Sequence, residues 1–222
     1  TEMSLEALIE KRAEFLTDYQ NKAYSERYAS LLSRVEEVER RQTPSMSGLA
    51  LSVAKNAFKL MAYKDEYEVA RLFSDGSFAK KIGQQFEGNY KIEFNLAPPL
   101  ISKKDPVTGR LKKRTYGPWM MNVFKLLSKL KVLRGTPFDI FGKTEERRTE
   151  RELVEHYFSL VDQLLANLNN ENHQIAVDLA SLPEQIRGYG HVKEKAIKAV
   201  KSKEQQLLGR FNNPALNRTA AE

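Results

Sequence analysis

Apolar residues near the N-terminus recur every three or four positions, which is the period of an α-helix. The series follows Ser4, a favourable helix-capping residue, and no Gly or Pro interrupts it before Pro44. Its members are Leu5, Leu8, Ile9, Phe15, Leu16, Tyr19, Ala23, Leu31, Val35 and Val38. The pattern predicts a long helix over residues 5–41, about 55 Å at about 1.5 Å per residue. We expect part of it to project or to pack on a neighbouring domain; a kink near residues 23–28 is the alternative.

The helical period returns along most of the remaining chain. Helices are predicted at 48–73 (with an interruption near Lys64 and Asp65), at 78–86, at 119–135, after the capping residue Thr144, at 172–181 and at 192–209. Between two of them, the segment GTPFDIFG (135–142) predicts an apolar loop tucked against the core.

Strict alternation of apolar and polar residues, which indicates a half-buried strand, is clear only in YKIEFNL (90–96). In the following DPVTG (105–109), Pro106 suits a type I turn and Gly109 a left-handed residue. These features predict a β-hairpin over residues 100–116 with an exposed tip. The predicted fold class is therefore mainly α: one helical domain with a long N-terminal helix and a small antiparallel β element that includes the hairpin.

The predicted hairpin carries most of the net charge of the chain. Residues 103–114 hold six cations and one anion, 6 − 1 = +5, out of a formal +7 for all 222 residues. The cations are Lys103, Lys104, Arg110, Lys112, Lys113 and Arg114. Such a concentration predicts a surface that binds an acidic partner, or one that pairs with acidic residues of a neighbouring domain. A free-standing nucleic-acid-binding module, with Tyr116 and Trp119 as stacking groups, is an alternative that the placement of the other aromatic residues on core faces disfavours.

Composition excludes several classes of site. The chain has no cysteine, which removes disulfides, thiolate zinc sites, cysteine nucleophiles and cysteine-ligated iron–sulfur clusters. No run of about 18 apolar residues is present, so we expect no membrane span. The first residues, Thr-Glu-Met-Ser, lack the pattern of a secretory signal. A cytoplasmic location is the expectation.

No catalytic or metal-binding constellation is visible in the sequence. The histidines His156, His173 and His191 are dispersed and form no metal-binding motif, and no pair of carboxylates stands in an apolar setting. The segment RGYGH (187–191) precedes a predicted helix, where backbone N–H groups can hold an anion. The candidate anion-binding residues are Arg187, Gly188, Gly190 and His191. The alternative is that Gly188 ends one helix and Gly190 allows the next to begin.

Several segments, taken together, resemble one known family. They are DYQNKAYSERY (18–28), ARLFSDGSF (70–78), FEGNYKIEFNLAPPLI (86–101), GPWM (117–120), LRGTPFDIFGKTEERRTERELV (133–154) and LPEQIRGYGHVKE (182–194). These segments are similar to the C-terminal domain of the large single-chain bacterial indolepyruvate ferredoxin oxidoreductases. The resemblance covers nearly the whole chain, and its motifs are long and distinctive.

The resemblance implies membership of an enzyme that oxidatively decarboxylates a 2-oxo acid with coenzyme A. That family uses thiamine diphosphate, Mg²⁺ and iron–sulfur clusters, all held by upstream domains. This chain lacks cluster cysteines and the thiamine diphosphate motif, so no catalytic or cofactor-binding residue is carried over to it. The resemblance predicts that residues 1–222 are a single non-catalytic C-terminal accessory domain, for which a start at Thr1 fits an excised piece. This domain would pack on the upstream catalytic domains and help to dock acidic ferredoxin or coenzyme A; the oligomeric state of the parent enzyme stays open.

Overall fold

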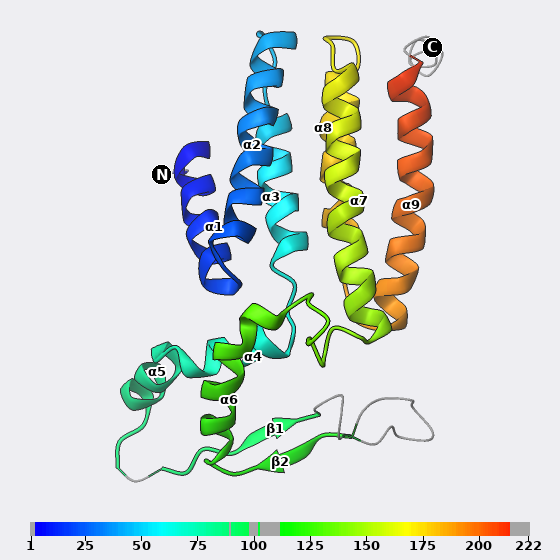
Figure 1. Cartoon of the computed structure of the whole chain (residues 1–222). Coiled ribbons are helices and arrows are strands. Elements are labelled where there is room, and N and C mark those ends of the chain that lie inside the picture. The colour runs from blue at the N-terminus through cyan, green and yellow to red at the C-terminus, as the bar shows by residue number, and fades with distance from the viewer. Residues whose placement is uncertain (1–2, 89, 98–101, 103–111, 214–222) are drawn as a thin grey trace. The chain divides into compact units, whose positions relative to one another are not determined.

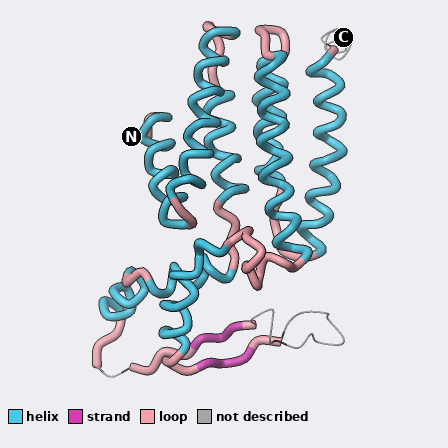
Figure 2. Tube along the Cα trace, in the orientation of Figure 1, coloured by secondary structure: helices cyan, strands magenta, loops and turns pink. Residues whose placement is uncertain are grey.

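The computed structural model describes residues 3–88, 90–97, 102 and 112–213, and the chain divides into two compact units. Unit 1 contains the described residues within 1–63 and 149–222, and unit 2 contains those within 64–148 (Figure 1). The described residues are mainly helical, with one small two-stranded antiparallel sheet (Figure 2). The predicted class, mainly α with a small antiparallel β element, is confirmed.

Unit 1 is a helical bundle. Its elements are α1 (Leu5–Tyr19), α2 (Lys22–Gln42), α3 (Leu49–Met61), α7 (Glu145–Asn167, whose first turn falls in unit 2), α8 (His173–Ser181), the 3₁₀ helix η2 (Leu182–Gln185) and α9 (His191–Asn212). Figure 1 shows α2, α3, α7 and α9 running side by side. Leu32, Val53 and Val161 are fully buried between these helices. Two tyrosines of this core donate to helix carbonyls: Tyr28 to Ala54 O at 3.0 Å and Tyr157 to Ala180 O at 2.8 Å. These bonds satisfy polar groups that burial would otherwise penalise.

The predicted single helix over residues 5–41 is wrong, because the chain breaks between α1 and α2. Gln20 leaves the helical conformation, and the side chain of Asn21 caps α2 by accepting from Tyr24 N at 2.9 Å. Helix α1 then packs against α2, where Ser25 Oγ donates to Ala13 O at 2.6 Å. The break also lies before the kink expected at residues 23–28.

The two-helix arrangement removes the length argument for a projecting first helix, whereas packing of α1 on a neighbouring domain stays a prediction. Leu16 and Tyr19 are fully buried in the core of unit 1, and Leu8 and Phe15 pack against that core in partly buried positions. The Tyr19 hydroxyl donates to Tyr63 O at 2.7 Å. Because the chain turns back at residues 20–21, the C-terminal part of the apolar stripe of α1 is buried in its own unit and the rest is partly buried.

Unit 2 is built on a cluster of phenylalanines. Its elements are α4 (Glu66–Ser74), α5 (Ser77–Gln85), β1 (Phe94–Leu96), β2 (Arg114–Tyr116), α6 (Met120–Lys129) and the 3₁₀ helix η1 (Leu130–Leu133). Helix α6 packs along α4. Between them, the Phe73 ring stacks on Phe124 with a centroid distance of 5.0 Å and meets the edge of Phe94 at 5.4 Å. Phe94 therefore joins the small sheet to the helices.

The β element differs from its prediction in extent and in pairing. The strand expected at residues 90–96 is reduced to β1, and β1 pairs with β2 in the register Phe94↔Tyr116 and Leu96↔Arg114. The partner of β2 therefore precedes Pro98 rather than following residue 100, as the predicted hairpin required. The turn at 105–109 and the cations Lys103, Lys104 and Arg110 lie outside the described residues. Lys112, Lys113 and Arg114 are described and are exposed.

The other predicted helices are confirmed, except that the helix expected at 119–135 ends as α6 at Lys129 and continues as η1 to Leu133. The interruption near Lys64 and Asp65 separates α3 from α4, and Asp65 caps α4 through Glu68 N at 2.8 Å. Thr144 Oγ1 accepts from Arg147 N at 3.3 Å at the start of α7. Within the described part of the chain, no helix is both long and apolar enough to cross a bilayer.

Candidate functional site

The residues predicted to bind an anion lie in the connection between η2 and α9 and at the first residue of α9, His191. Gly190 precedes α9 with φ +53°, and no side chain caps that helix. Gly188 has φ +90°, and a Cβ at this position would lie 2.7 Å from Val192 Cγ1. Arg187 Nε donates to Glu184 O at 3.0 Å, and His191 is exposed. The backbone angles account for both glycines, so anion binding at these residues stays a prediction.

Two more cations lie around this connection, but both already have partners. Lys59 Nζ donates to Pro183 O at 2.6 Å and to Ile186 O at 3.1 Å, which joins α3 to the turn before α9. Burial, and then the nearby charge of Arg187, lower the pKa of the Lys59 ammonium group. Lys193 contacts the Glu150 carboxylate at 2.6 Å. The lysines therefore hold the helices of unit 1 in place.

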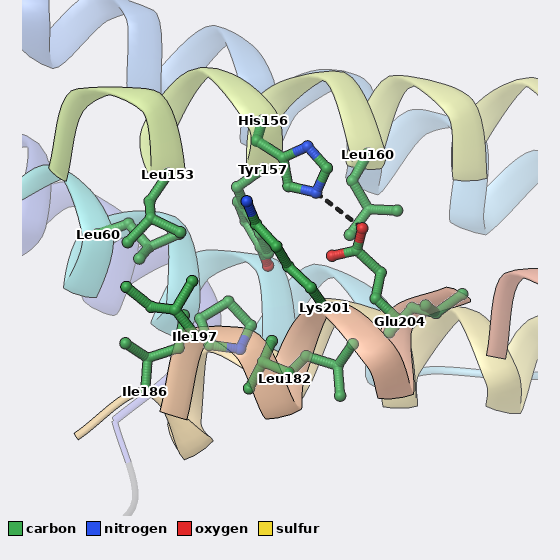
Figure 3. Close-up of a pocket in the computed structure, with 13 residues that line it drawn as sticks. Leu60, Leu153, His156, Tyr157, Leu160, Leu182, Ile186, Ile197, Lys201 and Glu204 are labelled. Carbon is green, nitrogen blue, oxygen red and sulfur yellow. Dashed lines mark hydrogen bonds and ion pairs between the residues drawn. The ribbon is translucent and has the colours of Figure 1, made fainter. Parts of the chain in front are cut away.

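A small pocket lies in unit 1 (Figure 3). Its lining comes from Leu60, Leu153, His156, Tyr157, Leu160, Leu179, Leu182, Pro183, Ile186, Ile197, Val200, Lys201 and Glu204. Figure 3 shows the His156 ring of α7 pointing toward the Glu204 carboxylate of α9, above a largely apolar lining. The cavity has a volume of about 20 Å³, which is room for about one water molecule. It is too small for a metabolite.

The polar pair in this pocket links two helices. His156 Nε2 and Glu204 Oε1 are 2.7 Å apart, and the Glu204 side chain is largely buried. The hydrogen bond to Glu204 raises the pKa of the His156 imidazole, against the opposing effect of burial. The pair therefore favours a protonated histidine between α7 and α9.

A second histidine–carboxylate pair is buried at the other ends of the unit 1 helices. Glu39 accepts from the backbone N–H groups of Leu49 and Ala50, at 2.8 and 2.9 Å, and so caps the start of α3. His173 Nε2, in the first residue of α8, lies 2.7 Å from the same carboxylate. The donors around Glu39 explain why a carboxylate is tolerated there, and they assign it a structural role.

The most unusual arrangement in unit 2 is a set of buried polar contacts around residues 134–142, which we call the Phe138 loop. Arg134 begins the loop and binds Asp65, the residue just before α4, through two hydrogen bonds of 2.6 and 2.8 Å. Both side chains are almost completely buried. Because Asp65 also caps α4, the loop is attached directly to the first turn of that helix.

Asp139 closes the Phe138 loop from its centre. Its carboxylate accepts from the N–H groups of Gly135 at 2.8 Å, Gly142 at 2.9 Å and Phe141 at 3.2 Å. It also accepts from the Tyr67 hydroxyl at 3.1 Å. Burial, and then the adjacent Asp139 charge, raise the pKa of Tyr67 well above its usual range, so this hydroxyl stays a donor. These bonds fix the loop in one conformation.

The fixed loop holds two large apolar side chains in solvent. Phe138 is 76% exposed and Ile140 is 55% exposed, whereas Asp139 between them and Phe141 are buried. The prediction that this loop is tucked against the core is correct for Phe141 and wrong for Phe138 and Ile140. The reason is the inward Asp139 carboxylate, which directs its two neighbours outward. Exposed apolar residues on a rigid support are typical of interaction sites.

The cofactors that the family resemblance implies find no fitting donors in the described residues. No group of three or more histidine, aspartate or glutamate side chains could hold a metal ion there, and the sequence has no cysteine for a cluster. Asp75, in the SDGS segment, accepts from Ser77 N at 2.9 Å and from Ser77 Oγ at 2.7 Å. These bonds assign Asp75 to the turn before α5.

Comparison with known proteins adds one match. The profile of DUF6537, a family of unknown function, matches residues 5–206. No curated protein and no solved structure matches the chain.

Proposed function

We propose that this chain, which belongs to the DUF6537 family of unknown function, is a non-catalytic accessory domain of a 2-oxo acid ferredoxin oxidoreductase of the indolepyruvate type. In this proposal the domain is cytoplasmic, packs on the catalytic domains of the same enzyme and helps to dock acidic ferredoxin or coenzyme A. Thiamine diphosphate, Mg²⁺ and iron–sulfur clusters belong to those other domains. The resemblance of the six segments named above supports the choice of enzyme.

The Phe138 loop is the observation that best supports a role in binding another protein. A loop that buries an ion pair and a four-donor carboxylate, yet leaves Phe138 and Ile140 in water, gives up apolar burial within its own unit. Covering such side chains with another protein recovers that burial. Because the loop is already ordered by its hydrogen bonds, binding costs little additional conformational entropy.

The basic segment 103–114 supports a role in docking an acidic partner. In its described part, Lys112, Lys113 and Arg114 are exposed at the start of β2. Electrostatic steering by such a patch raises association rates by about 10- to 1,000-fold at low salt. Pairing with acidic residues of a catalytic domain would use the same cations.

The natural full-length chain tests the proposal. Once purified with its own cofactors, it is assayed with indolepyruvate, coenzyme A and oxidised ferredoxin, with and without added thiamine diphosphate and Mg²⁺. The proposal predicts ferredoxin reduction that depends on the 2-oxo acid and coenzyme A. A natural chain without this activity, or one with no catalytic domains beside the present residues, would overturn it.

A further inference from the structure

A row of exposed apolar side chains leads from α6 to the Phe138 loop. Leu126 lies near the end of α6, and Leu130 and Val132 follow in η1. Leu126 is 60% exposed and Val132 is 52% exposed. The chain then turns directly into the loop, where Thr136 N donates to Leu133 O at 2.9 Å. Exposed apolar residues thus recur along the chain as far as Ile140, with the half-buried Leu133 and the buried Arg134 between Val132 and Phe138.

This row is separate from the face of α6 that builds the core of unit 2. Met120 and Phe124 are buried on that core face, against α4 and β1. A helix that packs on one side normally carries polar residues on the other. Leu126 departs from this rule, and Leu130, just beyond the end of the helix, is exposed as well.

The exposed charged groups beside this row are all positive. Lys125 and Lys129 are exposed on neighbouring turns of α6, and Lys143 is exposed just after the loop. Between residues 112 and 143 the sequence contains one acidic residue, Asp139, and that side chain is buried and fully hydrogen-bonded. The exposed ionised groups of this segment are therefore all cationic, although lysines four residues apart repel each other on a helix.

We infer that unit 2 carries a docking site for an acidic protein, formed by Leu126, Leu130, Val132, Phe138, Ile140, Lys125, Lys129 and Lys143 and here called the α6–loop surface. The apolar residues form the centre, and the lysines face carboxylates of the partner. Charge complementarity identifies the partner as acidic. The inference deepens the proposed function and rests on it for the choice of ferredoxin as the probe.

The rigid loop favours a protein partner over an anionic membrane. Phe138 and Ile140 are held in position by the buried bonds of Asp139 and Arg134. A fixed arrangement of this kind is useful where two shapes must fit each other. A bilayer adapts to the residues inserted into it and gains nothing from their exact spacing.

The two classes of residue act on different rate constants. Lysines around the contact mainly raise the association rate, by attraction that salt screens beyond about 10 Å at 0.1 M. Buried apolar side chains mainly slow dissociation. Each class can therefore be tested by its own kinetic signature.

Binding kinetics of the natural full-length chain with a purified acidic ferredoxin test the inference at low and at high salt. Combining Lys125→Glu, Lys129→Glu and Lys143→Glu should lower the association rate about 10-fold or more at low salt, with convergence on wild type at high salt. Combining Phe138→Ser and Ile140→Ser should raise the dissociation rate about 10-fold at both salt concentrations. Circular dichroism verifies that both variants are folded.

A matched control distinguishes the effect of the α6–loop surface on binding from the effect of the net charge of the chain. Lys195→Glu, Lys198→Glu and Lys203→Glu, at exposed positions of α9 in unit 1, change the net charge by the same amount and should leave both rate constants near wild type. An equal loss of binding in this control would overturn the inference. So would ferredoxin binding that neither α6–loop variant changes, or the absence of measurable binding by the wild type.

Two further measurements distinguish the alternatives. In one series, vesicles of phosphatidylglycerol and phosphatidylcholine replace ferredoxin. If the α6–loop variants lose vesicle binding but keep ferredoxin binding, the surface binds a membrane and the inference is overturned. Turnover of the wild type with indolepyruvate is followed in parallel. If the wild type shows no turnover, the proposed function fails. If the wild type turns over but the α6–loop variants bind ferredoxin as the wild type does, only this inference fails.

Discussion

Three buried carboxylates in this protein accept hydrogen bonds from backbone N–H groups. Asp65 caps α4, Glu39 caps α3 and Asp139 holds the Phe138 loop. Each also contacts one side chain far away in sequence; Arg134 is 69 residues from Asp65 and His173 is 134 residues from Glu39. Local signals predict a cap at the start of its own helix, as at Ser4 and Thr144, but they cannot predict a distant partner. This is why sequence reasoning missed both histidine–carboxylate pairs and the ion pair beneath the loop.

Removing Arg134 should destabilise unit 2 strongly. Arg134→Met keeps an apolar stem but leaves the buried Asp65 carboxylate without its cation, which costs about 3–5 kcal/mol. Urea unfolding followed by the fluorescence of Trp119, the sole tryptophan of the chain and part of unit 2, measures the loss. Lys22→Met is the control, because the Lys22–Glu26 pair is exposed and is worth less than about 1 kcal/mol. Equal effects of the two substitutions would contradict the structural role of Arg134.

The His156–Glu204 pair should make stability depend on pH. The pKa of His156 in the folded chain is raised above its ordinary value of 6.5 by the bond to Glu204. The stabilisation is therefore complete below pH 6.5 and is lost as the pH rises through the folded pKa. Thermal unfolding from pH 6 to pH 8 should show a decline that His156→Gln removes. If the variant keeps the same decline, another group is responsible.

At the scale of elements, the hydrophobic period predicts where helices occur better than where they end. It continues through Gln20 and Asn21, so only the capping side chain of Asn21 marks the break between α1 and α2. At Asp65 and Thr144 the same chemistry coincides with a change of pattern, and these starts are predicted correctly. The pairing of β1 with β2 is set by the Phe94 contacts with α4 and α6, which the local turn signal could not reveal.

Replacing glycine with alanine should have opposite effects on stability at Gly188, in the turn before α9, and at Gly209, within α9. Gly188→Ala places a Cβ at φ +90° and close to Val192, at an expected cost of about 1–2 kcal/mol. Gly209→Ala lies within α9 in open space and should stabilise the chain by about 0.5 kcal/mol. Thermal melts of the two variants compare them directly. A stabilising Gly188→Ala would contradict the backbone conformation described for this turn.

At the scale of the whole molecule, two units have separate cores and different surfaces. The core of unit 1 is formed by its helices, whereas unit 2 is held by its phenylalanine cluster and by the buried bonds of the Phe138 loop. The basic character of residues 112–143 is readable from sequence. The exposure of Phe138 and Ile140 is not, because GTPFDIFG reads as a buried apolar segment until the inward carboxylate of Asp139 is known.

The central claim is that the α6–loop surface contacts an acidic partner. Hydrogen–deuterium exchange of the natural full-length chain, with and without ferredoxin, tests it most directly. The account predicts slower exchange on binding for backbone amides between residues 125 and 142, and unchanged exchange for residues 195–203 of α9. Unchanged exchange at residues 125–142, with slower exchange elsewhere, would contradict it.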